Sequence, residues 1–144
     1  MAALTINLTP IGGLGGGRRN IGTQYIGDFF MAFTASDEYV TGGFDLSSGG
    51  TPGTDGNGLD AGSMTLLTDQ GWIDKIEFVE VTYMRYGEDA AITDPLSCEW
   101  IKATQKLKVW MNTLGAGVPA DLPNTVLLDS FQLRLRFWSS PHNQ

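Results

Sequence analysis

Residues 131–138 read FQLRLRFW and alternate almost perfectly between large apolar side chains and mostly polar ones. Successive side chains of a β-strand point to opposite faces of the sheet, so this period of two predicts a strand with one buried face. The expected inward side chains are Phe131, Leu133, Leu135 and Phe137. The expected outward side chains are Gln132, Arg134, Arg136 and Trp138. Such a strand belongs in a sheet that covers a core on one side only.

Other extended or alternating segments lie upstream, and glycine- or proline-rich stretches separate them. They are residues 4–9, 24–33, 39–46, 72–86, 99–103 and 106–111. Within 72–86, Ile76 and Phe78 share one phase of the alternation, and the other phase is shared by Val79, Val81 and Tyr83. This change of phase at Phe78 and Val79 predicts a β-bulge or a strand that passes between two sheets. Thr104 and Gln105 are predicted to form a tight hairpin turn. No stretch long enough for an ordinary helix keeps a period of 3.6 residues.

These patterns predict an all-β fold of about eight short antiparallel strands with long Gly-rich loops. Taken alone, they leave a β-sandwich, a jelly roll and a barrel open. The longest expected loop covers residues 47–63, and the 19 glycines of the chain suit many tight turns. We expect three parts: an N-terminal strand and flexible Gly-rich arm (1–23), a β-sandwich domain (24–139) and a disordered tail (140–144).

The length and charge of the chain limit the number of domains and the classes of partner that we expect. A chain of 144 residues fits one domain that needs no disulfide or metal to fold. The net charge of −7 opposes binding to nucleic acid and to anionic membranes. No apolar run is long enough to span a bilayer, and no apolar leader follows a basic start. We therefore expect a soluble protein without a secretory signal, nucleic-acid partner or membrane.

Candidate catalytic groups are few. The one histidine, His142, lies near the end of the chain, where a fixed triad geometry is rare, and a Cys98 nucleophile would need the same imidazole. One cysteine and one histidine cannot build a structural zinc site. The acidic pairs Asp37-Glu38 and Glu88-Asp89 are expected to be solvated surface. We therefore expect no catalysis, cofactor, metal or small-molecule substrate.

Two glycine-rich segments resemble ligand loops without completing the patterns. Residues 12–17 contain no G-x-G-x-x-G spacing and lead to no Gly-Lys-Ser/Thr, so we expect a mobile arm that orders on a partner. Residues 55–60 place Asp55 and Asn57 like the ligands of a calcium loop. Asp60 stands there in place of the required glycine, and Leu66 in place of the bidentate glutamate. A solvated loop is the expected form, with an ion site shared between loops left open.

Basic and aromatic side chains at outward positions suggest an interface. If the strands at 106–111 and 131–138 are neighbours, Lys102, Lys106, Lys108, Arg134 and Arg136 share one sheet face that would suit an acidic partner. The outward phases also hold three tryptophans, which are enriched at interfaces. The expected interface residues are Arg18, Arg19, Trp100, Lys106, Lys108, Trp110, Arg134, Arg136 and Trp138.

Four segments together resemble the small capsid decoration (cement) proteins of tailed phages, which are encoded near the major capsid protein. They read YVTGGFDL at 39–46, VTYMRY at 81–86, KLKVW at 106–110 and FQLRLRF at 131–137. The resemblance implies a jelly-roll-like β-sandwich that binds the outside of the assembled capsid as a homotrimer near three-fold axes. It implies the major capsid protein as the partner and the virion surface as the location, with no catalysis and no cofactor.

Two other functions compete with this expectation. A carbohydrate- or receptor-binding module of a phage fibre would use exposed tryptophan rings, such as that of Trp110, to stack on sugars. A glycoside hydrolase would need two convergent carboxylates, which the sequence does not locate.

Overall fold

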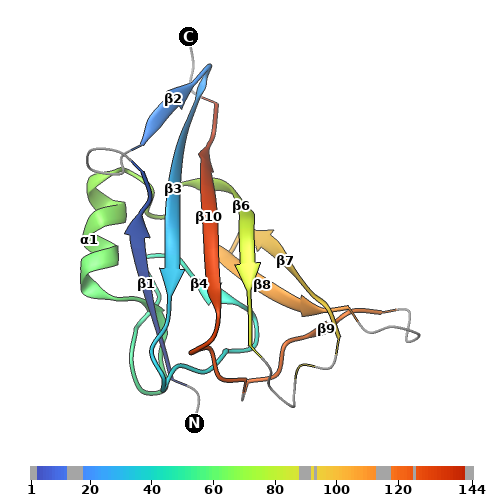
Figure 1. Cartoon of the computed structure of the whole chain (residues 1–144). Helices are drawn as coiled ribbons and strands as arrows, with labels where there is room; N and C mark the ends of the chain where they lie inside the picture. The colour runs from blue at the N-terminus through green and yellow to red at the C-terminus, as the bar shows by residue number, and fades with distance from the viewer. Residues whose placement is uncertain are drawn as a thin grey trace.

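The computed structural model describes residues 3–12, 18–87, 92, 94–112, 118–124 and 126–141 of the chain. The elements in chain order are β1 (Leu4–Pro10), β2 (Arg19–Ile21), β3 (Gln24–Ala32), β4 (Phe44–Asp45), β5 (Asn57–Leu59), α1 (Ala61–Asp69), β6 (Ile76–Arg85), β7 (Leu96–Ile101), β8 (Lys106–Met111), β9 (Ala120–Asp121) and β10 (Gln132–Ser139). The expectation of a mostly β chain is confirmed, and one short helix accompanies the strands (Figure 1).

The strands form two sheets. The larger has the order β5-β1-β3-β10-β6, and β2 pairs with β3 beside this path. The smaller has the order β4-β8-β7, and β9 pairs with β8. Pairing is antiparallel except between β1 and β5, which run parallel, so the expectation of purely antiparallel strands is wrong at this edge. A parallel pair needs a long connection, and here the chain between β1 and β5 contains β2, β3, β4 and their loops before it returns alongside its first strand.

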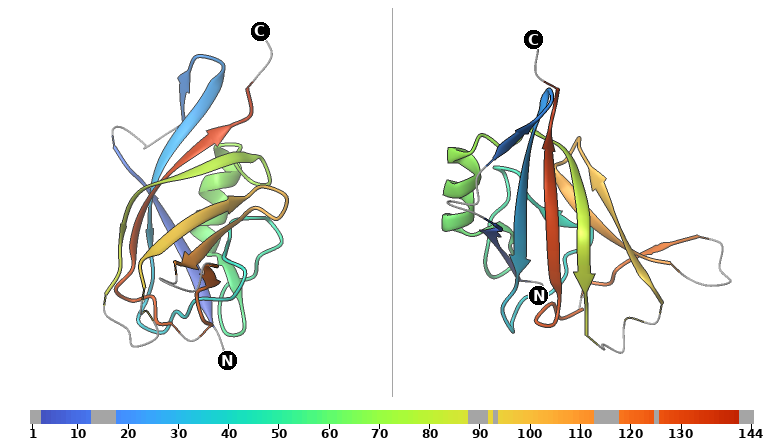
Figure 2. Two further views of the ribbon diagram at one scale, coloured as in Figure 1. Left: turned by 90° about the vertical axis from the view of Figure 1, so that its right-hand side faces the viewer. Right: turned by 45° about the horizontal axis from the view of Figure 1, so that its top comes forward.

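One hydrophobic core joins the two sheets. Strand β10 contributes Leu133, Leu135 and Phe137, and β8 contributes Leu107 and Val109. The smaller sheet and α1 lie on one side of the larger sheet (Figure 2, left). The described residues therefore leave the opposite face of β3, β10 and β6 without a covering element. We call this face the outer face.

Strand β10 has the alternation that its sequence predicts. Leu133, Leu135 and Phe137 are at most 1% exposed, whereas Gln132 and Arg134 are exposed. Phe131, just before the strand, is also buried.

Strand β6 carries two register shifts against β10. At the first shift, Phe78 pairs with Trp138 and Ile76 with Ser139, so no residue of β10 lies opposite Glu77. At the second, Val81 pairs with Leu135 and Tyr83 with Arg134, so no residue of β10 lies opposite Thr82. Each extra residue reverses the phase of the alternation. The expected bulge is thus present, but it lies at Glu77, and a second one follows at Thr82.

Helix α1 lies within and after the range 47–63, which was expected to be loop. The Asp60 side chain accepts a hydrogen bond from Ser63 N at 2.7 Å and caps the first turn, while Leu67 packs in the core. Nine residues are too few to show a sustained helical period, so the sequence pattern does not predict the helix. Among the described residues no helix is long and apolar enough to cross a membrane.

The same range holds the calcium-like loop, and its side chains serve local structure. Asn57 accepts from Asp45 N at 3.2 Å and donates to Gly43 O at 2.8 Å. Asp60 caps α1 and also accepts from Asn7 Nδ2 at 2.7 Å. In the described part of the chain no group of three or more His, Cys, Asp or Glu side chains could hold a metal ion.

The N-terminal segment joins the main sheet. Strand β1 pairs with β3 and β5, and β2 forms a hairpin with β3, so the described residues of 1–23 and those of 24–139 share one sheet. The mobile arm was predicted from residue 12 onward, and its residues 13–17 lie outside the described residues, as do residues 142–144 of the predicted tail. Arg18 and Arg19 are described and lie at the β2–β3 hairpin.

Candidate binding surface

The basic residues expected on one face belong to different sheets. Strand β8 pairs with β4, β7 and β9, whereas β10 pairs with β3 and β6. Because the inward side chains of both strands meet in one core, their outward side chains point to opposite sides of the molecule. Lys106 and Lys108 therefore do not share a surface with Arg134 and Arg136, and Lys102 lies in the β7–β8 turn.

The outward side of β8 is occupied by internal contacts. Lys108 Nζ lies 3.7 Å from Asp121 Oδ2 and 4.0 Å from the centroid of the Trp110 ring. The Trp110 indole N–H donates to Glu99 Oε1 at 3.1 Å. One face of the Trp110 ring and its polar edge are thus engaged within the chain. At most the other face is left for stacking on a sugar.

The other tryptophans differ from the expected pattern in part. Trp100 was expected to point outward, but it pairs directly with the inward Leu107 and packs against the core, so this expectation is wrong. Trp138 does lie on the outward side of β10 and is half-buried. Trp72 is 1% exposed.

The outer face has three rows of side chains that run across the strands. The first row contains Phe30, Arg134 and Tyr83. The second contains Asp28, Arg136 and Glu80. The third contains Arg19, Ile26, Trp138 and Phe78. Strand register alone places these side chains together, because residues directly opposite each other in neighbouring strands share one face.

The charged row is internally organised. Asp28 Oδ1 accepts from Arg136 Nε at 2.8 Å, and Asp28 Oδ2 accepts from Arg19 Nη2 at 2.9 Å. Burial alone would raise the pKa of Asp28, but hydrogen bonds and charge from Arg136 and Arg19 hold this pKa below its usual value. The hydrogen bond that Arg136 donates to Asp28 raises the pKa of Arg136 in turn. Asp28 therefore holds the side chains of Arg136 and Arg19 in place on the outer face.

Two aromatic residues of the outer face project into solvent. Phe78 is 51% exposed and Tyr83 is 44% exposed, and the Arg134 guanidinium lies 5.8 Å from the Tyr83 ring centroid. The sequence pattern does not predict their outward positions, because in it Phe78 is in phase with the buried Ile76 and Tyr83 is in phase with Val81. The bulges turn both rings outward. The adjacent apolar residues Phe78 and Val79 were the available signal, since two successive residues of a strand cannot both face the core.

The outer face differs in charge from the whole chain. The face has a net charge of +2, whereas the whole chain carries −7. Its basic residues are Arg19, Arg85, Arg134 and Arg136, and its acidic residues are Asp28 and Glu80. Exposed aromatic rings beside arginines are typical of the centres of protein interfaces. The arrangement can bind a flat surface of opposite charge.

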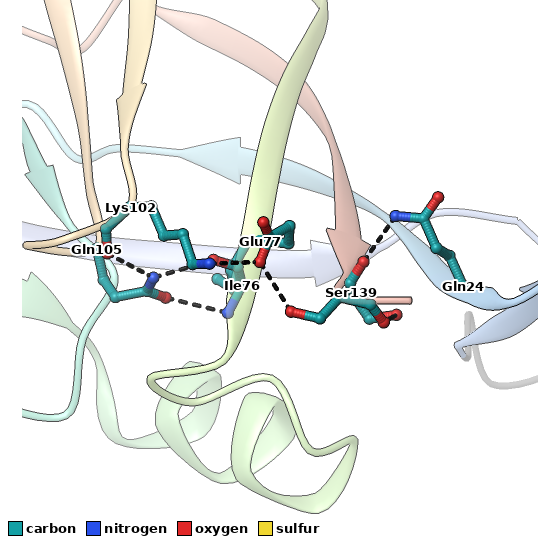
Figure 3. Close-up of polar contacts among 7 residues, drawn as sticks. Gln24, Ile76, Glu77, Lys102, Gln105 and Ser139 are labelled. Atoms are coloured by element: carbon teal, nitrogen blue, oxygen red, sulfur yellow. Dashed lines mark hydrogen bonds and ion pairs between the residues drawn. The ribbon is translucent and has the colours of Figure 1, made fainter. Parts of the chain in front are cut away.

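A hollow of about 880 Å³ lies between the β2–β3 hairpin and the β7–β8 turn. Most of its polar side chains bond within the chain (Figure 3): Lys102 Nζ lies 2.7 Å from Glu77 Oε2, which also accepts from Ser140 Oγ at 2.7 Å. The Gln105 amide bonds to the backbone of Ile76. Arg18 lies 3.9 Å from the centroid of the Tyr25 ring at the rim. These contacts connect the two sheets and give this end a structural role.

The candidate catalytic groups are not brought together among the described residues. The Asp37 carboxylate is buried and accepts from Thr5 N at 3.0 Å and Thr34 N at 2.6 Å, so it holds a turn. Burial raises the pKa of the Cys98 thiol to about 11, which disfavours the reactive thiolate. His142 and the pair at 88–89 lie outside the described residues.

No protein-family model, curated protein or solved structure matches the chain.

Proposed function

We propose that the chain is a structural virion protein: a capsid decoration protein that binds the outside of an assembled phage capsid and stabilises it. The observation that carries the proposal is the outer face, which presents exposed Phe78 and Tyr83 between arginines on an acidic chain. The resemblance of four sequence segments to decoration proteins supports the capsid as the partner. The proposal includes a homotrimer and a jelly-roll-like sandwich, and two sheets on one shared core support the sandwich.

Stabilisation follows from linkage. A protein that binds the assembled lattice better than free subunits shifts the equilibrium towards the lattice, by an amount set by the difference in affinity. The rigid outer face favours such a role, because Asp28 holds Arg19 and Arg136 in place before binding. Little side-chain entropy is then lost on association.

The test is co-sedimentation of the purified chain with empty shells assembled from the major capsid protein of the phage whose genome encodes the chain. We expect saturable binding to shells, weak binding to unassembled subunits, and a higher melting temperature of the decorated shell. Binding should weaken as salt increases, because arginines of the outer face meet acidic groups. Equal binding to shells and free subunits would contradict the proposal, as would no binding to either.

A matched pair of variants tests whether the outer face is the surface that binds the shell. Phe78→Ser removes an exposed ring from the outer face, and Leu127→Ser removes a similarly exposed apolar side chain elsewhere, since Leu127 is 46% exposed. We expect Phe78→Ser to weaken shell binding at least tenfold and Leu127→Ser to leave it unchanged, as for a hot spot and a residue outside the interface. Equal effects would place the interface elsewhere.

A further inference from the structure

Strands β6 and β7 each form an edge of a sheet, and their free edges border one groove. In the described part of the chain, β6 pairs only with β10 and β7 pairs only with β8, and no strand pairing joins β6 to β7. The two strands lie near each other and diverge along their length (Figure 2, right). A groove of about 590 Å³ between them is lined by residues 78–84 of β6 and 97–100 of β7. We call it the edge groove.

Side chains limit the edge groove at one end and on its floor. At the start of β6, the Gln105 amide bonds to the N–H and C=O of Ile76, as a neighbouring strand would. On the floor, Cys98 Sγ lies 3.7 Å from Met84 Sδ. Beyond Ile76 no comparable side-chain pair covers the free edge of β6 among the described residues. Uncovered edges of this length are rare, because they can pair with any extended chain.

The edge groove also holds an unpaired donor. Trp100 lines the groove, and its indole nitrogen is buried without a hydrogen-bond partner. An unpaired buried N–H is unfavourable, and native proteins contain few of them. A carbonyl oxygen of a segment in the groove would satisfy it.

The charge of the lining indicates the chemistry of the occupant. Glu80 and Glu99 are exposed carboxylates of the edge groove, and none of its lining residues is Lys, Arg or His. The remaining lining is mostly apolar or hydroxyl-bearing. A segment with apolar residues on one face and a basic side chain near the carboxylates fits this lining.

We propose that the edge groove binds an extended segment of a partner protein, apolar at alternate positions and carrying a lysine or arginine, as an added β-strand. Seven residues of β6, 78–84, border the groove, which matches a strand of about 23 Å at about 3.3 Å per residue. The edge groove shares Phe78, Glu80 and Tyr83 with the outer face. The two proposals are still tested apart, because a peptide added to the isolated chain tests the edge groove without any capsid.

The probe is a nine-residue peptide that alternates valine with threonine and has lysine at its centre, titrated into the ¹⁵N-labelled chain. We expect the backbone amides within residues 78–84 that point away from β10 to become protected from hydrogen exchange. The Trp100 indole N–H signal should move downfield. Trp100→Phe keeps an aromatic ring and removes the donor, so it should weaken binding up to about tenfold, the range of one hydrogen bond.

Two control peptides distinguish strand addition from non-specific binding of the peptide. Methylation of the backbone nitrogens on one edge of the peptide removes its ladder donors, and it should abolish binding. Glutamate in place of the central lysine should weaken binding and reverse its salt dependence, because Glu80 and Glu99 would then repel the peptide.

Three outcomes would overturn the proposal. The first is no change at residues 78–84 with the lysine peptide. The second is equal binding of the methylated peptide. The third is protection of these amides without peptide that grows with protein concentration, which would make a second copy of the chain the occupant.

Discussion

The side-chain amide of Gln105 pairs with both backbone polar groups of Ile76. Ile76 N donates to Gln105 Oε1 at 3.1 Å, and Gln105 Nε2 donates to Ile76 O at 2.9 Å. Nε2 also donates to Lys102 O at 2.9 Å, and the backbone of Gln105 has a φ of +54°. One residue of the β7–β8 turn therefore connects the smaller sheet to the first residue of β6 (Figure 3).

Replacing Gln105 by leucine should destabilise the fold by about 2–4 kcal/mol, because the buried Ile76 would lose a hydrogen-bond partner for its N–H and for its C=O. Urea unfolding followed by circular dichroism measures the difference. Gln132→Leu on the exposed side of β10 is the matched control and should change stability by less than about 0.5 kcal/mol. Similar losses for the two variants would show that the amide pairing contributes nothing.

Alanine substitutions at two neighbouring glycines distinguish the effect of backbone strain on stability from that of a steric clash. Gly42 and Gly43 have φ values of +106° and +111°, so alanine is strained at either position. A Cβ at Gly43 would lie 2.5 Å from Leu107 O, whereas at Gly42 the nearest atom, Lys106 Nζ, is 4.0 Å away. We expect Gly42→Ala to cost about 1–2 kcal/mol. Gly43→Ala should cost about 3 kcal/mol or more, because β8 must move. Equal costs in urea unfolding would contradict this reading.

The sequence predicts elements well where one face is buried and the other is not. The alternation in residues 131–138 determines which side of β10 meets the core, and Leu107 and Val109 do the same for β8. Alternation does not say which strand lies beside which, so it could not assign Arg134 and Lys108 to opposite sides of the molecule. That arrangement depends on contacts between residues far apart in the chain.

The outer face was predictable in part for the same reason. Arg134, Arg136 and Trp138 follow from the simple period of β10, whereas Phe78 and Tyr83 depend on bulges at Glu77 and Thr82. Each bulge inserts one residue, and a single inserted residue reverses every later side chain. The break in the pattern was visible in the sequence, but its position was not, because either neighbour of the break can be the extra residue.

Asp28→Asn should lower stability at neutral pH by about 1–3 kcal/mol, because Asp28 accepts charged hydrogen bonds from Arg136 and Arg19. The pKa of Asp28 is lowered in the folded state from a usual value of 3.8. The stabilising contribution is therefore present above that value and is lost as the pH falls through the lowered pKa. Urea midpoints of the two proteins should converge below pH 3.8; a constant gap down to pH 2 would exclude this ionisation as the cause.

Cys98 should make stability fall at alkaline pH. Burial raises the pKa of its thiol from 9.0 to about 11, so the unfolded chain ionises first as the pH rises. The contribution is fully present below pH 9.0 and is lost as the pH rises towards 11. Between pH 8 and pH 10 the free energy of unfolding should fall by about 1 kcal/mol more in the wild type than in Cys98→Ala.

The comparison of these two proteins isolates the thiol. Burial also raises the pKa of the Tyr39 phenol, but Tyr39 is present in both proteins, so its contribution cancels in the difference. Parallel stability curves for the wild type and Cys98→Ala would show that the thiol ionises alike in both states. Alkylation by iodoacetamide at pH 8 checks the same point directly. The folded thiol should react about a hundredfold more slowly than the thiol in urea, because only the thiolate is nucleophilic and its population falls tenfold for each unit of raised pKa.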